Sequence, residues 1–226
     1  MSESSVLSMS STPPTPPVML ARSPIKPVPP VTEVGGWEVS GRSSTAGLTL
    51  SDASPLAKVQ VKAPWNGAMA ARLGVPHGRA APDRYGTLVV GSAPGEWLLI
   101  DAPGTSGDLV QRVQAAAADL VATELVTVVD LTHGRAMMRL TGERSLDLLA
   151  KVCGVDLSED LVPDGAALRT SVARLATDVI YQSHGRERSY VMHCERSSGQ
   201  YLFDVLLDAG AEFGIDIDGF TSSAAT

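Results

Sequence analysis

The sequence of 226 residues is poor in cysteine, in aromatic side chains and in long apolar runs. Its two cysteines are Cys153 and Cys194, and no Cys-x-x-Cys or His/Cys cluster has the spacing of metal ligands, so no metal site is predicted. Cys153 lies on the apolar face of an expected helix and Cys194 at the end of an expected strand. We expect two buried thiols in a reducing compartment, with a disulfide as the alternative.

Membrane-spanning runs and basic clusters are also missing. No stretch approaches the roughly 20 apolar residues that a membrane span needs, and the first residues lack the basic and apolar regions of a signal peptide. A net charge of −7 without a run of Lys or Arg argues against a nucleic-acid surface. These absences predict a cytoplasmic protein that binds neither nucleic acid nor a membrane.

Proline is concentrated at the start of the chain. Residues 1–30 are rich in Ser, Thr and Pro, which leave few donors for regular structure, and are expected to form a disordered tail. A proline-rich docking ligand is one alternative. Another is an arm that wraps a partner subunit, because Met19, Leu20 and Ile25 offer apolar anchors. Residues 31–219 are expected to form one domain, and residues 220–226 a flexible tail.

Patterns of strands followed by a helix recur along the domain. Residues 86–91 and 96–101 predict a β-hairpin, and residues 107–124 the clearest helix. Residues 127–154 read as strand, turn, strand and helix, with Thr141 expected to cap that helix and Gly154 to end it. Further strands are expected at 167–175, 178–182 and 189–194, and a helix at 200–208. The recurrence predicts an α+β fold of antiparallel sheets covered by helices.

Two stretches resemble the aminomethyltransferase (glycine-cleavage T-protein) family. The segment DLTHGRAMMRLTGERSLDLLAKVCGVDL carries the resemblance through Arg139-Leu140-Thr141-Gly142, and YLFDVLLDAGAEFGIDIDGF carries it through Ala209 to Gly214. The chain is much shorter than a complete T-protein. Its length, the segment CERSSGQYLFDVLL and the loop-rich N-terminal part are more similar to the gamma-subunit family of heterotetrameric sarcosine oxidases.

This resemblance implies a folate-binding type of α+β fold and an assembly role in a complex that oxidises N-methylated amines such as sarcosine. It implies that FAD, FMN, NAD and tetrahydrofolate belong to partner subunits: larger alpha and beta flavoprotein chains and a small delta chain. The family's acidic pair corresponds to Thr177-Asp178, and its folate-contacting "G-Y-T-G-E-D-G" loop has no counterpart near residues 196–201. The resemblance therefore supports the fold more than independent catalysis.

Two other functions remain open at this point. One is a small tetrahydrofolate-dependent aminomethyltransferase or demethylase that uses Asp178. The other is a stand-alone binding protein for a small amine or carboxylate.

Asp178 and His133 are the candidate catalytic residues. His133 in a turn could act as a general base, and Asp178 as a remnant acid or base. A structural turn residue and a carboxylate that meets an arginine are the competing interpretations. Arg169, Arg174 and Arg196 are the candidates for cofactor binding; the first two are expected on a strand, where a solvated face or a salt bridge is the competing interpretation.

Overall fold

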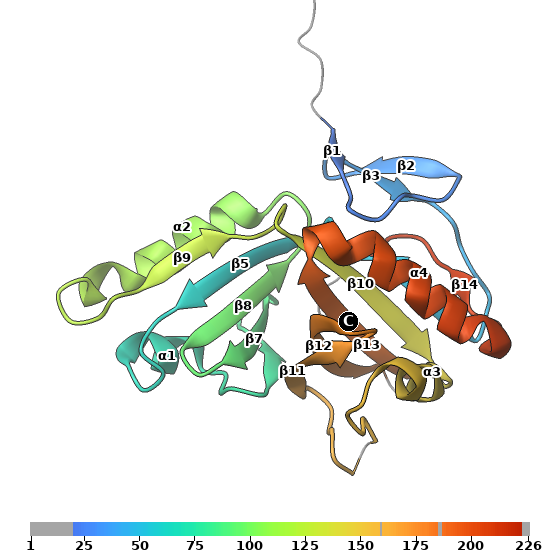
Figure 1. Ribbon diagram of the computed structural model, residues 1–226. Coiled ribbons are helices and arrows are strands. Elements are labelled where there is room, and N and C mark those ends of the chain that lie inside the picture. Colours follow the sequence, from blue (N-terminus) through green and yellow to red (C-terminus); the bar gives the residue numbers. More distant parts are fainter. Residues whose placement is uncertain (1–19, 159, 185–186, 223–226) are drawn as a thin grey trace, which may run out of the picture.

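The computed structural model describes residues 20–158, 160–184 and 187–222, and Figure 1 shows the arrangement of their elements. One six-stranded sheet has the order β11-β12-β13-β10-β4-β14, and one five-stranded sheet the order β6-β7-β8-β5-β9. The six strands are β4 (Leu48–Asp52), β10 (Arg135–Gly142), β11 (Ala167–Val172), β12 (Leu175–His184), β13 (Glu187–Glu195) and β14 (Asp216–Ile217). The five strands are β5 (Ala57–Lys62), β6 (Ala80–Pro82), β7 (Leu88–Ala93), β8 (Glu96–Asp101) and β9 (Thr127–Asp130).

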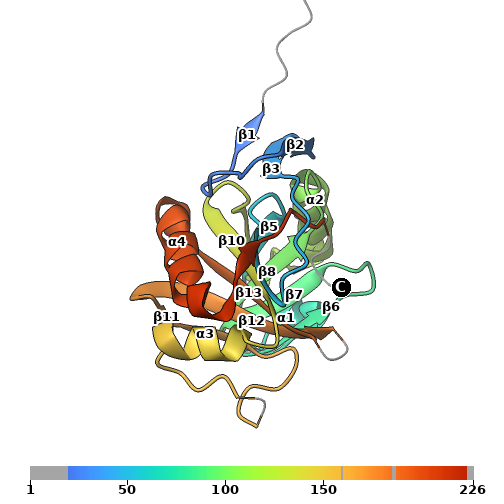
Figure 2. The same cartoon turned by 90° about the vertical axis from the view of Figure 1, so that its right-hand side faces the viewer.

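Helices cover the outer face of each sheet. They are α1 (Ala68–Leu73), α2 (Ser106–Ala117), α3 (Ser145–Val152) and α4 (Gly199–Gly210). Seen from the side, α3 and α4 lie on one side of the molecule and α2 on the other, with the two sheets between them (Figure 2). The pairs within the two large sheets are antiparallel except for β14 with β4. The predicted α+β fold is confirmed.

Alternation along the strands explains these layers. In β10, Met138 packs with the cluster under α3 and α4, while its neighbour Met137 packs with the cluster between the sheets. In β7, Val89 packs under α1 and α2, and Val90 faces the opposite sheet. Because successive side chains of a strand point to opposite faces, a β-strand that is apolar on both sides becomes the middle of such a stack.

The two sheets join along one side. The amide of Ala80 donates to the carbonyl of Gly165 over 2.7 Å, and the amide of Ala167 donates to that of Gly78 over 3.0 Å. These bonds tie the β6 edge of one sheet to the start of β11 in the other. They satisfy backbone groups that an open sheet edge would leave unpaired.

The N-terminal part forms a small third sheet of β1 (Ala21–Arg22), β3 (Trp37–Ser40) and β2 (Val31–Val34), in which β1 is parallel to β3. Ile25 is 1% exposed and packs in the cluster under α4. Residues 20–30, assigned by sequence to the tail, therefore belong to the folded part, because one apolar anchor among the prolines reaches the core. Residues 1–19 and 223–226 of the two expected tails lie outside the described residues.

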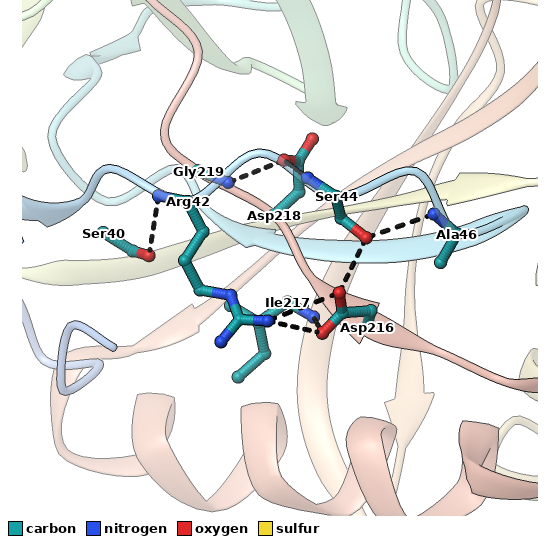
Figure 3. Close-up of polar contacts among 8 residues, drawn as sticks. All are labelled: Ser40, Arg42, Ser44, Ala46, Asp216, Ile217, Asp218 and Gly219. Atoms are coloured by element: carbon teal, nitrogen blue, oxygen red, sulfur yellow. Dashed lines mark hydrogen bonds and ion pairs between the residues drawn. The ribbon is translucent and has the colours of Figure 1, made fainter. Parts of the chain in front are cut away.

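A polar cluster fastens the C-terminal segment (Figure 3). The side chain of Arg42 donates to Asp216 Oδ1 over 3.2 Å, and Ser44 Oγ donates to Asp216 Oδ2 over 2.8 Å. The amide of Ser44 donates to Asp218 Oδ1 over 3.0 Å. Phe220 then packs against the cluster between the sheets, so the folded part extends to this residue.

Candidate functional site

Strand register brings the candidate Asp178 and Arg169 together. Arg169 of β11 pairs directly with Asp178 of β12, and Asp178 pairs with His193 of β13. Directly opposed side chains on one face of an antiparallel pair lie within reach of each other. Asp178 is the fourth residue of β12, so the expectation of a strand start was wrong. The tight turn at Ala173-Arg174 lets β12 begin earlier than the sequence indicated.

These residues form a charged row that crosses between the two large sheets. Arg169 Nε donates to Asp178 Oδ1 over 2.9 Å, and Arg169 Nη2 donates to Glu96 Oε1 of β8 over 2.9 Å. Lys62 Nζ lies 3.4 Å from the other oxygen of Glu96. At the inner end, His193 Nδ1 lies 3.6 Å from Asp178 Oδ2, beyond hydrogen-bond distance. We refer to Lys62, Glu96, Arg169, Asp178 and His193 as the inter-sheet charge row.

Burial and pairing set the protonation states in this row. Burial acts to raise the pKa of Glu96, but the hydrogen bond and the charge of Arg169, with help from Lys62, lower it overall. Burial lowers the pKa of His193 to about 4, and the charge of Asp178 only partly opposes this shift. At neutral pH the row therefore contains a neutral histidine beside an arginine with two carboxylate partners.

The row is better suited to holding the sheets together than to acid–base catalysis. Asp178 is 7% exposed and accepts from Arg169, and His193 is 3% exposed. Neither nitrogen of the His193 ring has a hydrogen-bond partner within the described chain. A general base must reach the proton that it removes, and a buried, ion-paired Asp178 lacks that access. The competing interpretation of Asp178, a carboxylate that meets an arginine, describes the observed geometry.

His133 lies outside this row. It occupies the turn between β9 and β10, and its ring stacks on Trp37 of β3 with centroids 4.7 Å apart and an interplanar angle of 11°. Offset or parallel stacking of this kind contributes roughly 0.5–1.5 kcal/mol beyond area burial. The structure thus places His133 in the contact that holds the small N-terminal sheet, apart from Asp178.

The three candidate arginines do not converge on one site. Arg174 is at the tip of the β11–β12 hairpin with φ +66°, so the expectation of a strand position was wrong. Arg196 donates to the carbonyls of Arg22 and His133 over 2.6 and 3.3 Å, beside the N-terminal sheet. Arg169 already holds two carboxylates. The structure therefore does not assemble these three arginines around one ligand carboxylate.

A hollow of about 790 Å³ lies elsewhere, between α1, α2 and the β6–β7 hairpin. Arg72, Arg84 and Arg112 line its rim. Arg72 forms two hydrogen bonds with Asp119, and Arg112 lies 3.7 Å from Asp83 and 3.8 Å from Asp101. Most of the positive charge at this rim is therefore neutralised within the chain.

Sequence reasoning missed a buried lysine. The alternation of apolar and polar residues over 57–63 predicts a strand with one solvent-exposed face, yet the Lys58 side chain on that face has no exposed surface. Its Nζ donates to the carbonyls of Ser54 and Leu56 over 2.7 and 2.6 Å. Burial lowers the pKa of Lys58 to about 7, against the opposing charges of Asp52 and Asp130. Alternation alone cannot distinguish a solvated face from one that a second sheet covers.

Both cysteines are free and buried, as expected. Burial raises the pKa of Cys194 to about 11, so its thiolate is scarce at neutral pH. The described residues contain no cluster of His, Cys, Asp and Glu able to hold a metal ion. Within the same ranges, each helix is too short or too polar to span a bilayer.

Known proteins share this architecture. One chain of the heterotetrameric sarcosine oxidase from Corynebacterium sp. U-96, solved in complex with pyrrole 2-carboxylate, superposes with a TM-score of 0.62 at 24% sequence identity, covering 76% of this chain and 88% of that chain. The glycine cleavage system aminomethyltransferase T from Bartonella henselae superposes with a TM-score of 0.65 at 13% identity. That match covers 88% of this chain and 60% of the aminomethyltransferase.

No curated protein matches the chain. A family match, in contrast, spans residues 85–225, which is more than half of the sequence. The matched residues contain the whole of α2, α3 and α4 and most of the six-stranded sheet. The chain therefore belongs to the GCVT N-terminal domain family and has an aminomethyltransferase fold.

Proposed function

We propose that the chain is a gamma-type assembly subunit of a heteromeric, flavin-dependent oxidase of sarcosine or a similar N-methyl amine. The likeness to one chain of a heterotetrameric sarcosine oxidase carries this proposal. The match covers most of both chains, so the two have similar lengths. The aminomethyltransferase T, in contrast, extends well beyond the matched part.

The state of Asp178 supports an assembly role over catalysis by this chain. By the sequence resemblance, the family's acidic pair corresponds to Thr177-Asp178. Arg169 donates to one oxygen of the Asp178 carboxylate, and Asp178 is buried. In this proposal FAD, FMN, NAD and tetrahydrofolate belong to the partner subunits, namely larger alpha and beta flavoproteins and a small delta chain. The role of this chain is then to present a rigid two-sheet surface to them.

Co-expression tests the proposal. A tagged chain produced together with the products of its neighbouring genes should purify with larger flavoprotein chains at fixed stoichiometry, and the assembly should be yellow and consume oxygen when sarcosine is added. The isolated chain should be colourless and inactive. If the tagged chain emerges alone from such co-expression, the assembly role is wrong.

Calorimetry tests the alternative folate-dependent activity on the same protein. The isolated chain should show no saturable heat with tetrahydrofolate. Saturable binding that Asp178→Asn abolishes, with turnover by the isolated chain, would favour an aminomethyltransferase or demethylase instead.

A further inference from the structure

The strand β9 forms one edge of the five-stranded sheet. It pairs with β5 on one side, and no strand of the described chain pairs with its other side. Figure 1 shows it as the outer strand beside α2. Three of its four residues are exposed, and Val129 remains 41% exposed. An open edge of this kind offers a row of unpaired backbone donors and acceptors.

The register shows which backbone groups face outward. The amide of Leu131 donates to the carbonyl of Lys58 over 2.8 Å. Hydrogen-bonded pairs alternate with non-bonded pairs along an antiparallel ladder, so the bonds to β5 continue at Val129 and Thr127. The N–H and C=O groups of Val128 and Asp130 therefore point to the open edge.

Apolar side chains surround this edge. Val121 is 80% exposed and Leu125 is 82% exposed, both in the loop that leads into β9. A hollow of about 540 Å³ lies next to the strand, and its apolar lining includes Ala117, Val121, Leu125, Val126 and Val128. An exposed edge with an adjacent side-chain hollow is the arrangement used in recognition by strand addition, where backbone bonds give affinity and hollows give specificity.

The two carboxylates near this edge accept hydrogen bonds from the protein's own backbone. The carboxylate of Glu124 accepts hydrogen bonds from the amides of Ala68 and Met69 at the start of α1. Asp130 Oδ1 accepts from the amide of Thr132 over 2.8 Å. These hydrogen bonds hold the two carboxylates against the protein's own backbone, so part of their hydrogen-bonding capacity is already satisfied before a partner covers the surface. The strand sequence TVVD also lacks the proline and lysine that commonly protect edges.

We propose that an extended apolar segment of a larger partner subunit adds to the β9 edge and places one side chain in the adjacent hollow. This inference rests on the proposed assembly function and names the surface that performs it. A polypeptide in extended conformation can pair with the alternating backbone donors and acceptors of the β9 edge. The exposed side chains of Val121, Leu125 and Val129 favour apolar side chains on that polypeptide. A second copy of this chain is the competing extended occupant.

Matched edge variants test the proposal in the assembly. Val129→Lys introduces a charge at the β9 edge, and Val31→Lys introduces the same charge on β2, where Val31 is 49% exposed. Val129→Lys should weaken binding to the purified larger flavoprotein subunits at least tenfold, whereas Val31→Lys should leave it unchanged. Circular dichroism confirms that each variant is folded. Equal binding by both variants would overturn the proposal.

Hydrogen exchange on the unsubstituted protein gives an independent test that does not depend on variant folding. In the assembly, the peptide that contains Val128 and Asp130 should exchange at least tenfold more slowly than in the isolated chain. An assembly that forms without this protection rejects the edge but leaves the assembly function standing. An isolated chain that dimerises with β9 protected assigns the edge to a second copy. Failure to assemble at all rejects both proposals.

Discussion

Arg169 donates from Nε to Asp178 Oδ1 over 2.9 Å and is also the direct register partner of that residue across the β11–β12 pair. The same guanidinium reaches Glu96 in the opposite sheet over 2.9 Å. One arginine thus connects two sheets through two carboxylates.

Replacement of Arg169 by Met should lower the free energy of unfolding by about 1–3 kcal/mol, because two partly buried carboxylates lose their shared partner. The estimate is below that for a fully buried pair, since the Arg169 side chain is 43% exposed. Urea denaturation measures the loss. Arg174→Met, at the tip of the same hairpin, is the control and should change stability by less than about 0.5 kcal/mol.

His193 should make the protein sensitive to acid. Its pKa is lowered to about 4 in the folded state from about 6.5 when unfolded. Between these values the unfolded chain binds more protons, so stability rises with pH and is lost as pH falls from about 6.5 to 4. The full effect is roughly 3 kcal/mol.

His193→Gln should flatten this dependence while preserving a polar side chain. Unfolding free energies measured from pH 4 to 7 for both proteins give the difference that belongs to this residue. A difference that is constant with pH would show that His193 does not titrate as the geometry indicates.

Trp37 should control the attachment of the N-terminal sheet. It is 4% exposed and stacks on His133, so Trp37→Ala should cost about 3–5 kcal/mol, the range for a buried aromatic residue. Hydrogen exchange should accelerate first in β1–β3. Trp65 is 71% exposed, and Trp65→Ala should leave both stability and exchange in β1–β3 almost unchanged.

Gly142 should not tolerate a side chain. Its φ is +132°, and an added Cβ would collide with the carbonyl of Gly47 and lie 2.9 Å from Leu48 Cα in the paired strand β4. Gly142→Ala should therefore lower stability by more than about 2 kcal/mol. A Cβ added at Gly154 would have no atom within 4 Å. Gly154→Ala should therefore leave the Tm measured by thermal unfolding almost unchanged.

The sequence predicted most elements but not their partners. The β7–β8 hairpin and the positions of α2, α3 and α4 were expected from periodicity. Residues 127–142 also contain the two strands expected there, but β9 joins the five-stranded sheet and β10 the six-stranded one. Periodicity reports which faces are buried and does not report which strand lies alongside.

Local signals failed where tertiary pairing overrides them. Thr141 was expected to cap a helix, but it lies in β10 and pairs with Ser189 of β13, and α3 starts at Ser145 without a side-chain cap. Gly154 was expected to end that helix in a left-handed conformation, whereas Cys153 ends it in an extended one. The sequence indicated Asp178 and Arg169 as candidates but not the bond from Arg169 to Glu96 in the other sheet, because Glu96 lies 73 residues before Arg169.

The strand order has a consequence for truncation of this chain. The family match, residues 85–225, begins after β4 and β5, yet β4 lies between β10 and β14, and β5 lies between β8 and β9. A fragment cut at residue 85 would lose an interior strand from each sheet and leave two ladders interrupted. The segment shared by sequence is therefore smaller than the unit that can fold, and any minimal version of this protein must keep the residues from β4 onward.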